Sequence, residues 1–436
     1  MKKTLAITGI IIFAILLRLA YVGFVRNEPT VRAGSDEVDY DHLAFGLAAG
    51  NGYVDSQGNP TSRRAPLVPA VFALLYIVFG HSIAAVRIAQ ALVGASTCFV
   101  VYLIGKDVFS EKVGLLSAGL SAIYPIFIVF TGMLLSETIF IFFLVLAVYF
   151  LAKKSGRAFI NYFLAGALFG LAALARPSVL PLPFFILFVS AIFTPASIKG
   201  MLKKALILTV AVFIVIAPWT ARNYCVHKEF VLISTQFGPV ILSSYFYPEK
   251  GFGFSDTELQ KKLTEGVSNE VERSRILTRY AMESLARNPL TFIRLLPLKF
   301  LWFMEPFDGM NYGFGSSFNI VYGLIFVFFL FGLAGSRAAW EKLLPLYSVI
   351  CYFILASLIS YGSRRFRMQA EPFIIIFASY GAFWAAERWK KERLIRAALI
   401  IGIAANFFFF FSAGSIKAFS KKIAGFFGYY HFKGDK

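Results

Sequence analysis

The chain has 436 residues, a formal net charge of +19, and a composition that is 58% hydrophobic and only 15% charged. Its mean hydropathy is +0.70. A soluble domain needs more polar surface than this to cover its core, so the composition excludes the soluble globular classes. In a membrane protein an excess of lysine and arginine reports topology more often than nucleic-acid binding, and no nucleic-acid partner is predicted.

Apolar segments of the length that an α-helix needs to cross the hydrocarbon core recur along nearly the whole sequence. We therefore predict an all-α polytopic membrane protein with about eleven transmembrane helices. The first segment follows Lys2 and Lys3 without a small-residue cleavage site, so it is expected to remain as a signal anchor. The predicted spans are 4–26, 84–105, 113–130, 136–152, 158–175, 178–195, 203–219, 318–335, 342–360, 368–386 and 394–412.

Loop charges predict the orientation, because lysine and arginine are held on the cytoplasmic side. With the N-terminus inside, two long outer loops result, 27–83 and 220–316, within a single membrane domain over residues 1–436. The predicted location is the cytoplasmic (inner) membrane, with the active site on the outer face. The basic turns that then fall inside are 106–112, 153–157, 199–204, 337–342 and 387–396.

The outer loops are expected to carry helices at the membrane surface. The stretch 66–79 is apolar and is predicted to be a half-inserted or juxtamembrane helix. Residues 255–258 resemble a capping box that starts a polar amphipathic helix. The apolar stretch 289–304 is placed on the outer surface.

Several arginines fall on the outer face, against the trend of the loop charges. An anionic ligand on that face would explain them, since a guanidinium binds phosphate through a planar fork and keeps its charge. Contact with lipid headgroups is the alternative and stays open. The arginines are Arg63, Arg64, Arg176, Arg222, Arg364, Arg365 and Arg367, the last three together with Tyr361 at one helix junction.

The densest acidic segment lies just after the first span and places four carboxylates within six residues. In helical geometry Asp36 shares a face with Asp39 or Tyr40, and Glu37 shares another with Asp41. A carboxylate at the membrane surface can act as a general base toward a hydroxyl or an amine. An ordinary solvated loop is the alternative.

A further acid, Glu137, follows Ser136 at the outer end of a predicted span. An ionisable residue so deep in apolar sequence costs ~2.5–3.5 kcal/mol on insertion scales unless it is paired or lines a wet cavity. A carboxylate favoured by the helix dipole at a helix N-terminus explains it equally well.

The three cysteines and four histidines are scattered, so the sequence predicts neither a disulfide framework nor a metal site. Glycine-rich phosphate loops are absent, so a nucleotide donor has no evident cradle. No cofactor is predicted. A divalent metal is left open, because a pyrophosphate donor would favour one.

Several motifs in this order resemble one family of enzymes. The chain resembles the C-type, polyprenol-dependent membrane glycosyltransferases, specifically the bacterial relatives of dolichyl-phosphate-mannose protein mannosyltransferases and of lipid A aminoarabinose transferases. The resemblance runs over nearly the whole length. The matching segments are Asp36-Glu37, Leu47 to Tyr53, Arg64 to Pro69, Leu135 to Thr138, Ala175 to Pro177, Pro218 to Tyr224, Ser234 to Gly238, and Arg365 to Pro372.

The resemblance implies that a sugar is transferred from a polyprenyl-phosphate carrier to an acceptor on the outer face. It also implies that Asp36 occupies the position of the family's catalytic carboxylate in the first loop. Glu137 lies where relatives often have a second functional acid, frequently Asp. One departure is Ala65, where a proline is common.

We predict an inverting glycosyltransferase that transfers a hexosyl or pentosyl group from a lipid phosphate. Asp36, Glu37 and Glu137 are the candidate catalytic residues, with Asp36 as the base. The charge of the departing phosphate would be stabilised by Arg364, Arg365 and Arg367, with support from other outer arginines. The predicted substrate-binding residues are Tyr40, Arg63, Arg64, Arg176, Arg222, Tyr361, Arg364, Arg365 and Arg367.

The expected partners are a polyprenyl-phosphate-linked sugar, a glycan, lipid or protein acceptor, and membrane lipids. A rival class is a transporter or flippase that binds the same phosphate without catalysis, which predicts broken helices and internal repeats. No convincing repeat is evident. A non-catalytic subunit of a glycosylation complex is the third alternative.

Overall fold

The computed structural model describes residues 2–24, 36–153, 157–194, 198–246, 257–304, 319–360 and 364–411. Within these ranges the chain is helical apart from its connections, and the one β pairing is an isolated bridge between Val54 and Pro60. The all-α polytopic class is therefore confirmed. The chain divides into two compact units, residues 1–235 with 338–349, and residues 236–337 with 350–436.

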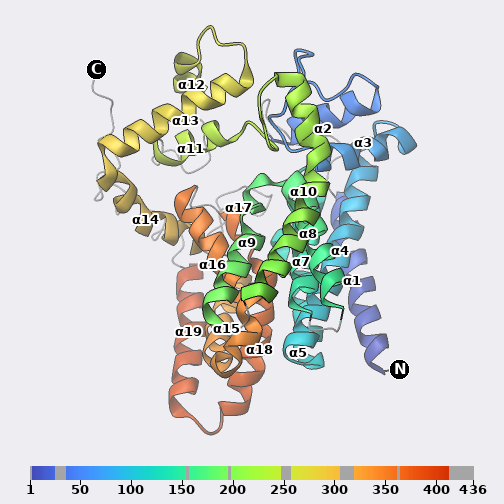
Figure 1. Ribbon diagram of the computed structural model, residues 1–436. Coiled ribbons are helices and arrows are strands. Elements are labelled where there is room, and N and C mark those ends of the chain that lie inside the picture. Colours follow the sequence, from blue (N-terminus) through green and yellow to red (C-terminus); the bar gives the residue numbers. More distant parts are fainter. Residues whose placement is uncertain are drawn as a thin grey trace. The chain divides into compact units, whose positions relative to one another are not determined.

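The first unit is built around four helices that pack in succession, α4 against α7, α7 against α8, and α8 against α10 (Figure 1). The shorter helices α2 and α3 pack on each other, and α3 leads into α4. The helices are α1 (Lys2–Phe24), α2 (Asp36–Ala48), α3 (Leu67–Phe79), α4 (Ile83–Val108), α5 (Glu111–Ile123), α6 (Pro125–Val129), η1 (Phe130–Gly132), α7 (Glu137–Ala152), α8 (Ala158–Ala175), η2 (Pro177–Val179), α9 (Leu182–Phe193) and α10 (Ile198–His227).

The close approach of α8 and α10 depends on small residues. A Cβ placed on Gly166 would lie 2.5 Å from the carbonyl oxygen of Leu208, and one on Gly170 would lie 2.8 Å from Val215 Cβ. Small residues are used in this way where apolar helices pack without a hydrophobic driving force between them. This contact fixes the end of α8 beside the end of α10.

The predicted span 113–130 is not one straight helix. It is α5 followed by α6 and η1, with a bend of 57°. Arg18 of α1 is fully buried at this break, and its guanidinium donates to the carbonyl oxygens of Ser121 (3.2 Å) and Ala122 (3.1 Å). The last carbonyls of a helix have no partner within the helix, so Arg18 satisfies the end of α5.

The second unit contains a small core and a group of apolar helices. Residues of α11, α13 and α14 form the core cluster around Leu242, Leu277 and Leu295. The helix α15 packs closely on α18, because Gly332 of α15 leaves room for the backbone of α18 and Gly381 of α18 leaves room for the backbone of α15. The helices are α11 (Phe237–Phe246), α12 (Thr257–Leu263), α13 (Glu270–Arg287), α14 (Pro289–Met304), α15 (Ile320–Gly335), α17 (Arg364–Arg367), α18 (Glu371–Arg388) and α19 (Arg393–Phe411), while α16 (Trp340–Ile359) has residues in both units.

Every predicted span contains a helix over most of its length in the described residues. Within the described ranges, five helices are long and apolar enough to cross a membrane, or six when the bent pair is counted as one span. Four apolar helices are shorter, α3, α7, α15 and the η2–α9 pair. The predicted surface helices 66–79 and 289–304 are α3 and α14, while residues 255 and 256 of the expected capping box lie outside the described part. The count of eleven spans stays a prediction.

Candidate active site

The acidic segment after α1 forms the first turn of α2. Asp36, Glu37 and Asp39 lie in this turn, where the helix dipole favours negative charge. The face predicted for Asp36 and Asp39 is observed, because both bind Arg64, whereas Glu37 bonds to the amide of Leu134. Asp41 accepts hydrogen bonds from Tyr76 and His81 and takes no part in the first group.

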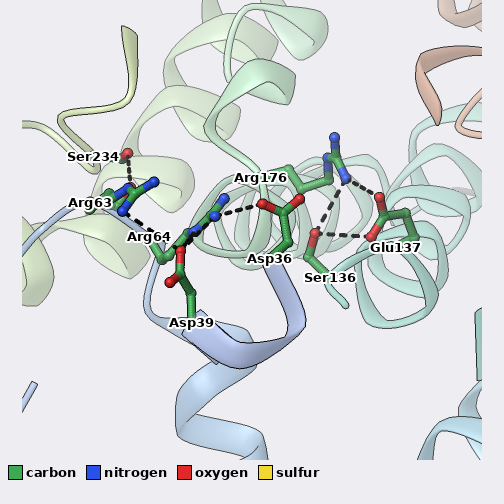
Figure 2. A network of polar contacts seen from close by, with 8 residues as sticks. All are labelled: Asp36, Asp39, Arg63, Arg64, Ser136, Glu137, Arg176 and Ser234. Atoms are coloured by element: carbon green, nitrogen blue, oxygen red, sulfur yellow. Dashed lines mark hydrogen bonds and ion pairs between the residues drawn. The ribbon is translucent and has the colours of Figure 1, made fainter. Parts of the chain in front are cut away.

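Arg64 is the shared partner of Asp36 and Asp39 (Figure 2). Its Nη2 lies 2.6 Å from Asp36 Oδ1 and 2.7 Å from Asp39 Oδ2, and its Nε donates to the same Asp39 oxygen at 3.1 Å. Burial disfavours the charged guanidinium, but the two carboxylates outweigh it and raise the pKa of Arg64. Arg64 therefore stays charged. Its neighbour Arg63 reaches Asp39 only at 3.9 Å, with a side chain that is 61% exposed.

A second ion pair joins α7 to the end of α8. Arg176 Nη1 lies 2.8 Å from Glu137 Oε1, and it also donates to Ser136 Oγ at 3.3 Å (Figure 2). The side chain of Glu137 has no exposed surface, so this pair is buried on one side. Removing one partner of such a pair leaves an uncompensated charge, which is strongly destabilising.

Tyr40 lies between the two ion-paired groups. Its side chain is buried, its ring lies 5.6 Å from the Arg64 guanidinium carbon, and its hydroxyl bonds with Ser136. Burial raises the pKa of Tyr40, while the charges of Arg64 and Arg176 act in the opposite direction. Because Tyr40 interacts with both arginines, the two groups belong to one polar cluster at the end of the first unit where α7 begins and α8 ends.

Glu37 is attached to this cluster by the backbone. Its Oε2 accepts a hydrogen bond from the amide of Leu134 at 3.1 Å. Burial raises the pKa of Glu37, the Leu134 amide and Arg87 lower it, and the negative charges of Asp36 and Glu137 raise it further. The three predicted acids therefore interact electrostatically.

Arg222 is used to hold the segment that carries Arg64. It donates to the carbonyl oxygens of Thr61 (2.8 Å) and Tyr53 (3.0 Å) and to Ser62 Oγ (3.0 Å). The guanidinium of Arg222 therefore binds the backbone at Tyr53 and Thr61 and the hydroxyl of Ser62.

The carbonyl groups of the three residues after Thr61 each accept a hydrogen bond from a different residue. The amide of Thr235 donates to Ser62 O at 3.1 Å, and Ser234 Oγ donates to Arg63 O at 2.7 Å. The hydroxyl of Tyr53 donates to Arg64 O at 3.0 Å. We call residues 61–65 the arginine segment, and its backbone is fixed from the end of α10 and from the loop that follows α2.

The basic residues predicted around 361–367 belong to the second unit. Tyr361 lies outside the described residues, and of Arg364 only the helical backbone is described. Arg367 is 1% exposed and forms an ion pair with Glu371 at 2.9 Å, with its guanidinium carbon 3.6 Å from the Tyr322 ring centroid. Its Nη1 donates to Phe303 O at 3.0 Å. These contacts are typical of a structural role. A phosphate contact by Arg364 or Arg365 stays a prediction.

Sequence reasoning missed Arg87 and Gln90 of α4, which are both 1% exposed and bind backbone beside Glu37. The signal was present, because a charged residue within a predicted span is expensive unless it is paired. The cost holds for Arg87 in the predicted span 84–105 as it does for Glu137 in the span 136–152. No group of three or more His, Cys, Asp and Glu side chains suited to a metal ion occurs among the described residues.

Residues 63–221 match a family model, described as dolichyl-phosphate-mannose-protein mannosyltransferase. Two structures of the oligosaccharyltransferase from Archaeoglobus fulgidus cover most of the chain. The AglB complex with an inhibitory peptide and a dolichol-phosphate is 18% identical, with a TM-score of 0.54 over 91% of this chain and 51% of that chain. The apo form is 17% identical, with a TM-score of 0.55 over 93% and 54%.

The chain shares the fold of these membrane-embedded oligosaccharyltransferase structures over most of its length. At these identities the solved structures carry the fold alone, and the chain spans about half the length of the oligosaccharyltransferases it matches. ArnT from Cupriavidus metallidurans bound to undecaprenyl phosphate is 15% identical over 87% of this chain and 79% of that chain, but its TM-score of 0.43 is too low to carry an argument. A comparison with curated proteins finds no match.

The resemblance found in the sequence is thus confirmed by the family match and by the fold. The family match includes Arg63, Arg64, Glu137 and Arg176. It begins after Asp36 and Glu37 and ends just before Arg222. The acids of α2 therefore rest on the geometry of the cluster.

Proposed function

We propose that the protein catalyses inverting transfer of a sugar from a polyprenyl-phosphate carrier to an acceptor on the outer face of the cytoplasmic membrane. The observation that carries this proposal is the polar cluster around Tyr40, in which Arg64 and Arg176 are held beside Asp36 and Glu137. Acids for proton transfer and cations for a phosphate occur together there, on a glycosyltransferase fold.

In this reaction Asp36 takes the proton of the acceptor hydroxyl or amine as that atom attacks the anomeric carbon. The bond between the anomeric carbon and the phosphate oxygen breaks, and polyprenyl phosphate leaves with the electron pair. A single displacement of this kind inverts the configuration. General base catalysis by a positioned carboxylate contributes typically ~10²–10⁴-fold in rate.

Arg64 and Arg176 are the proposed cations for the phosphate. The hydrogen bonds of Arg64 to carboxylates use Nε and Nη2, so among the described residues Nη1 remains for a phosphate oxygen. Preorganised cations aimed at developing negative charge are usually the largest catalytic contribution, and loss of one such contact costs ~2.7–4 kcal/mol. Glu137 holds Arg176 in place and keeps its net charge low before the donor binds.

The outer-face location follows from the loop charges, which put the end of α8 and the start of α7 outside when the basic turns are cytoplasmic. The matched family is named for transfer from a dolichyl-phosphate sugar, and a polyprenyl-phosphate sugar is the corresponding donor class proposed for this chain. The acceptor is a glycan, a lipid or a protein of the cell envelope.

The test is to purify the protein, supply a panel of radiolabelled undecaprenyl-phosphate sugars with membrane extract as acceptor, and measure release of polyprenyl phosphate. Asp36→Asn is compared with the wild type. The matched control is Asp41→Asn, which changes an acid on the same helix that bonds to Tyr76 and His81. We expect Asp36→Asn to lose turnover by at least ~10²-fold while it still binds donor, and Asp41→Asn to keep turnover.

Turnover that survives Asp36→Asn would contradict the assignment of the base. Donor binding without turnover in the wild type, across the whole panel, would favour a transporter, a flippase or a non-catalytic subunit. Absence of binding in every protein would contradict the phosphate role of the arginines.

A further inference from the structure

The turn between η1 and α7 is held by two buried side chains of α4. Arg87 donates from Nε to the carbonyl oxygen of Gly132 at 2.8 Å. Gln90, one helical turn later, donates from Nε2 to the carbonyl oxygen of Met133 at 2.7 Å. Both side chains are 1% exposed. Buried backbone carbonyls need a donor, so these two side chains fix the path of the chain at this point.

The same turn presents an amide to the acids of α2. After Met133 the chain folds tightly, with the amide of Leu135 donating to Met133 O at 2.8 Å. The Leu134 amide between them points to Glu37 and donates to its Oε2 at 3.1 Å. The helix α7, with Glu137 in its first turn, begins two residues after Leu135. A shift of this turn would therefore move Glu37 and Glu137 together.

Arg87 also acts on Glu37 through its charge. Burial is the largest effect on Glu37 and raises its pKa, whereas the Leu134 amide and the Arg87 guanidinium lower it. Arg87 thus favours the ionised carboxylate that the Leu134 amide also binds. The other charged or titratable groups that face Glu37 are Asp36, Glu137 and Tyr21.

We propose that Arg87 and Gln90 are positioning residues, which hold the 130–135 turn so that the Leu134 amide fixes the carboxylate of Glu37 within the active site. Neither side chain touches a substrate in this assignment, and both act through Glu37. The inference rests on the proposed transferase function. It goes beyond that function because it assigns catalytic geometry to a buried part of α4.

The kinetic test uses four variants of the full chain. Gln90→Met removes the donor to Met133 and keeps the side-chain volume, Arg87→Met removes both the donor and the charge, and Arg87→Lys keeps the charge. Thr97→Val is the matched control, because Thr97 is a buried α4 residue whose hydroxyl bonds only to its own helix at Val93 O. The readouts are kcat, the KM for the donor, and the midpoint of thermal unfolding.

We expect a fall in kcat of roughly tenfold to a hundredfold in Gln90→Met and Arg87→Met, the size that small misplacements of catalytic groups produce. The KM for the donor should change less than kcat, because Arg64 is held by the acids of α2, whereas only Arg176 is tied to this turn through Glu137. Thr97→Val should keep its kcat even where its unfolding midpoint falls. An equal loss of kcat in Thr97→Val, or a loss that follows the unfolding midpoint in all variants, would overturn the proposal.

A second readout does not need turnover. The titration of Glu37 is followed in the carboxyl band of the infrared spectrum, as the difference between each protein and the same protein with Glu37→Gln. Arg87→Met should move this titration to higher pH, and Arg87→Lys should return most of the shift. An unmoved titration in Arg87→Met would contradict the role of Arg87 toward Glu37, whether or not a donor is ever found.

If Arg87→Met does not fold, Arg87→Lys provides the test. A lowered kcat in Arg87→Lys with an unchanged titration of Glu37 supports the proposal. An unchanged kcat in Arg87→Lys opposes it.

Discussion

The environment of Glu37 disfavours the ionised form of its carboxyl group. Burial and two neighbouring acids raise its pKa above the ordinary value of 4.5, and the Leu134 amide and Arg87 only partly offset this. A carboxyl group with a raised pKa in the folded protein stabilises the fold below the unfolded pKa, and this contribution is lost as the pH rises through the folded pKa. Glu37 therefore contributes less to the stability of the fold at neutral pH than it does below the unfolded pKa.

The variant Glu37→Gln should consequently raise the unfolding midpoint at neutral pH, because an amide oxygen still accepts from Leu134 and carries no charge. The advantage over the wild type should shrink as the pH falls through the raised pKa of Glu37 in the folded protein, and it should vanish below the ordinary value of 4.5, where the carboxyl is protonated in both states. Thermal unfolding of both proteins in detergent, over a series of pH values, measures this difference. A constant difference at all pH values would contradict the assignment of the raised pKa.

At the scale of elements, the arginine segment depends on the end of α10. Arg222, Ser234 and Thr235 donate to consecutive carbonyl groups of residues 61–63, and Tyr53 donates to the next. The orientation of Arg64 toward the acids of α2 is thus set by segments that lie more than 150 residues away along the chain. No single contact is strong, but each carbonyl that loses its donor is costly when buried.

Arg222→Lys should weaken this arrangement, because an ammonium group cannot reproduce the planar fork that reaches Thr61, Ser62 and Tyr53 together. We expect a loss of ~1–3 kcal/mol in the free energy of unfolding from the carbonyls left without a donor, and a reduced kcat as Arg64 shifts. Arg63→Lys is the control, since the Arg63 side chain is largely exposed and touches Asp39 only at 3.9 Å. Equal effects of the two substitutions would refute the structural role of Arg222.

The elements were largely predictable from the sequence, and the contacts of the arginines were not. Continuous apolar runs determine where helices lie, and helical spacing determines that Asp36 and Asp39 share a face; the helices and this shared face are both observed. A sequence does not show which buried carbonyl or carboxylate a guanidinium will meet, so the contacts of Arg222 with Thr61 and of Arg367 with Glu371 were not predicted, and a phosphate contact by either arginine stays a prediction. The bend at α5–α6 was missed for a similar reason, since it is satisfied by Arg18 from a distant helix.

At the scale of the whole molecule, the proposal requires the active-site end of the first unit to face outward. Cys225 is a natural reporter of this orientation, because it is exposed two residues before the end of α10, whereas Cys98 is buried in α4 and Cys351 lies in the middle of the apolar helix α16. A maleimide that cannot cross membranes should label Cys225 in intact cells or spheroplasts.

The Cys225→Ser variant should remain unlabelled under the same conditions and serves as the control. Labelling that appears only after the membrane is opened would place this end in the cytoplasm. That result would reverse the predicted orientation and remove the argument from the loop charges.

Arg18 also has a consequence for how the chain is made. It lies in α1, and its carbonyl partners at Ser121 and Ala122 are 103 and 104 residues further along the sequence. At a synthesis rate of ~5–20 residues per second, α1 waits roughly 5–20 s in the insertion machinery or the bilayer before those partners emerge. During that time the charge lacks the carbonyl groups at the end of α5, and for most of it also Cys98, so the folded contacts of Arg18 are incomplete until α5 is made. Biogenesis of the first unit is therefore coupled across α1, α4 and α5, and a released chain truncated before Ser121 should be removed by membrane proteases faster than one truncated after Gly132.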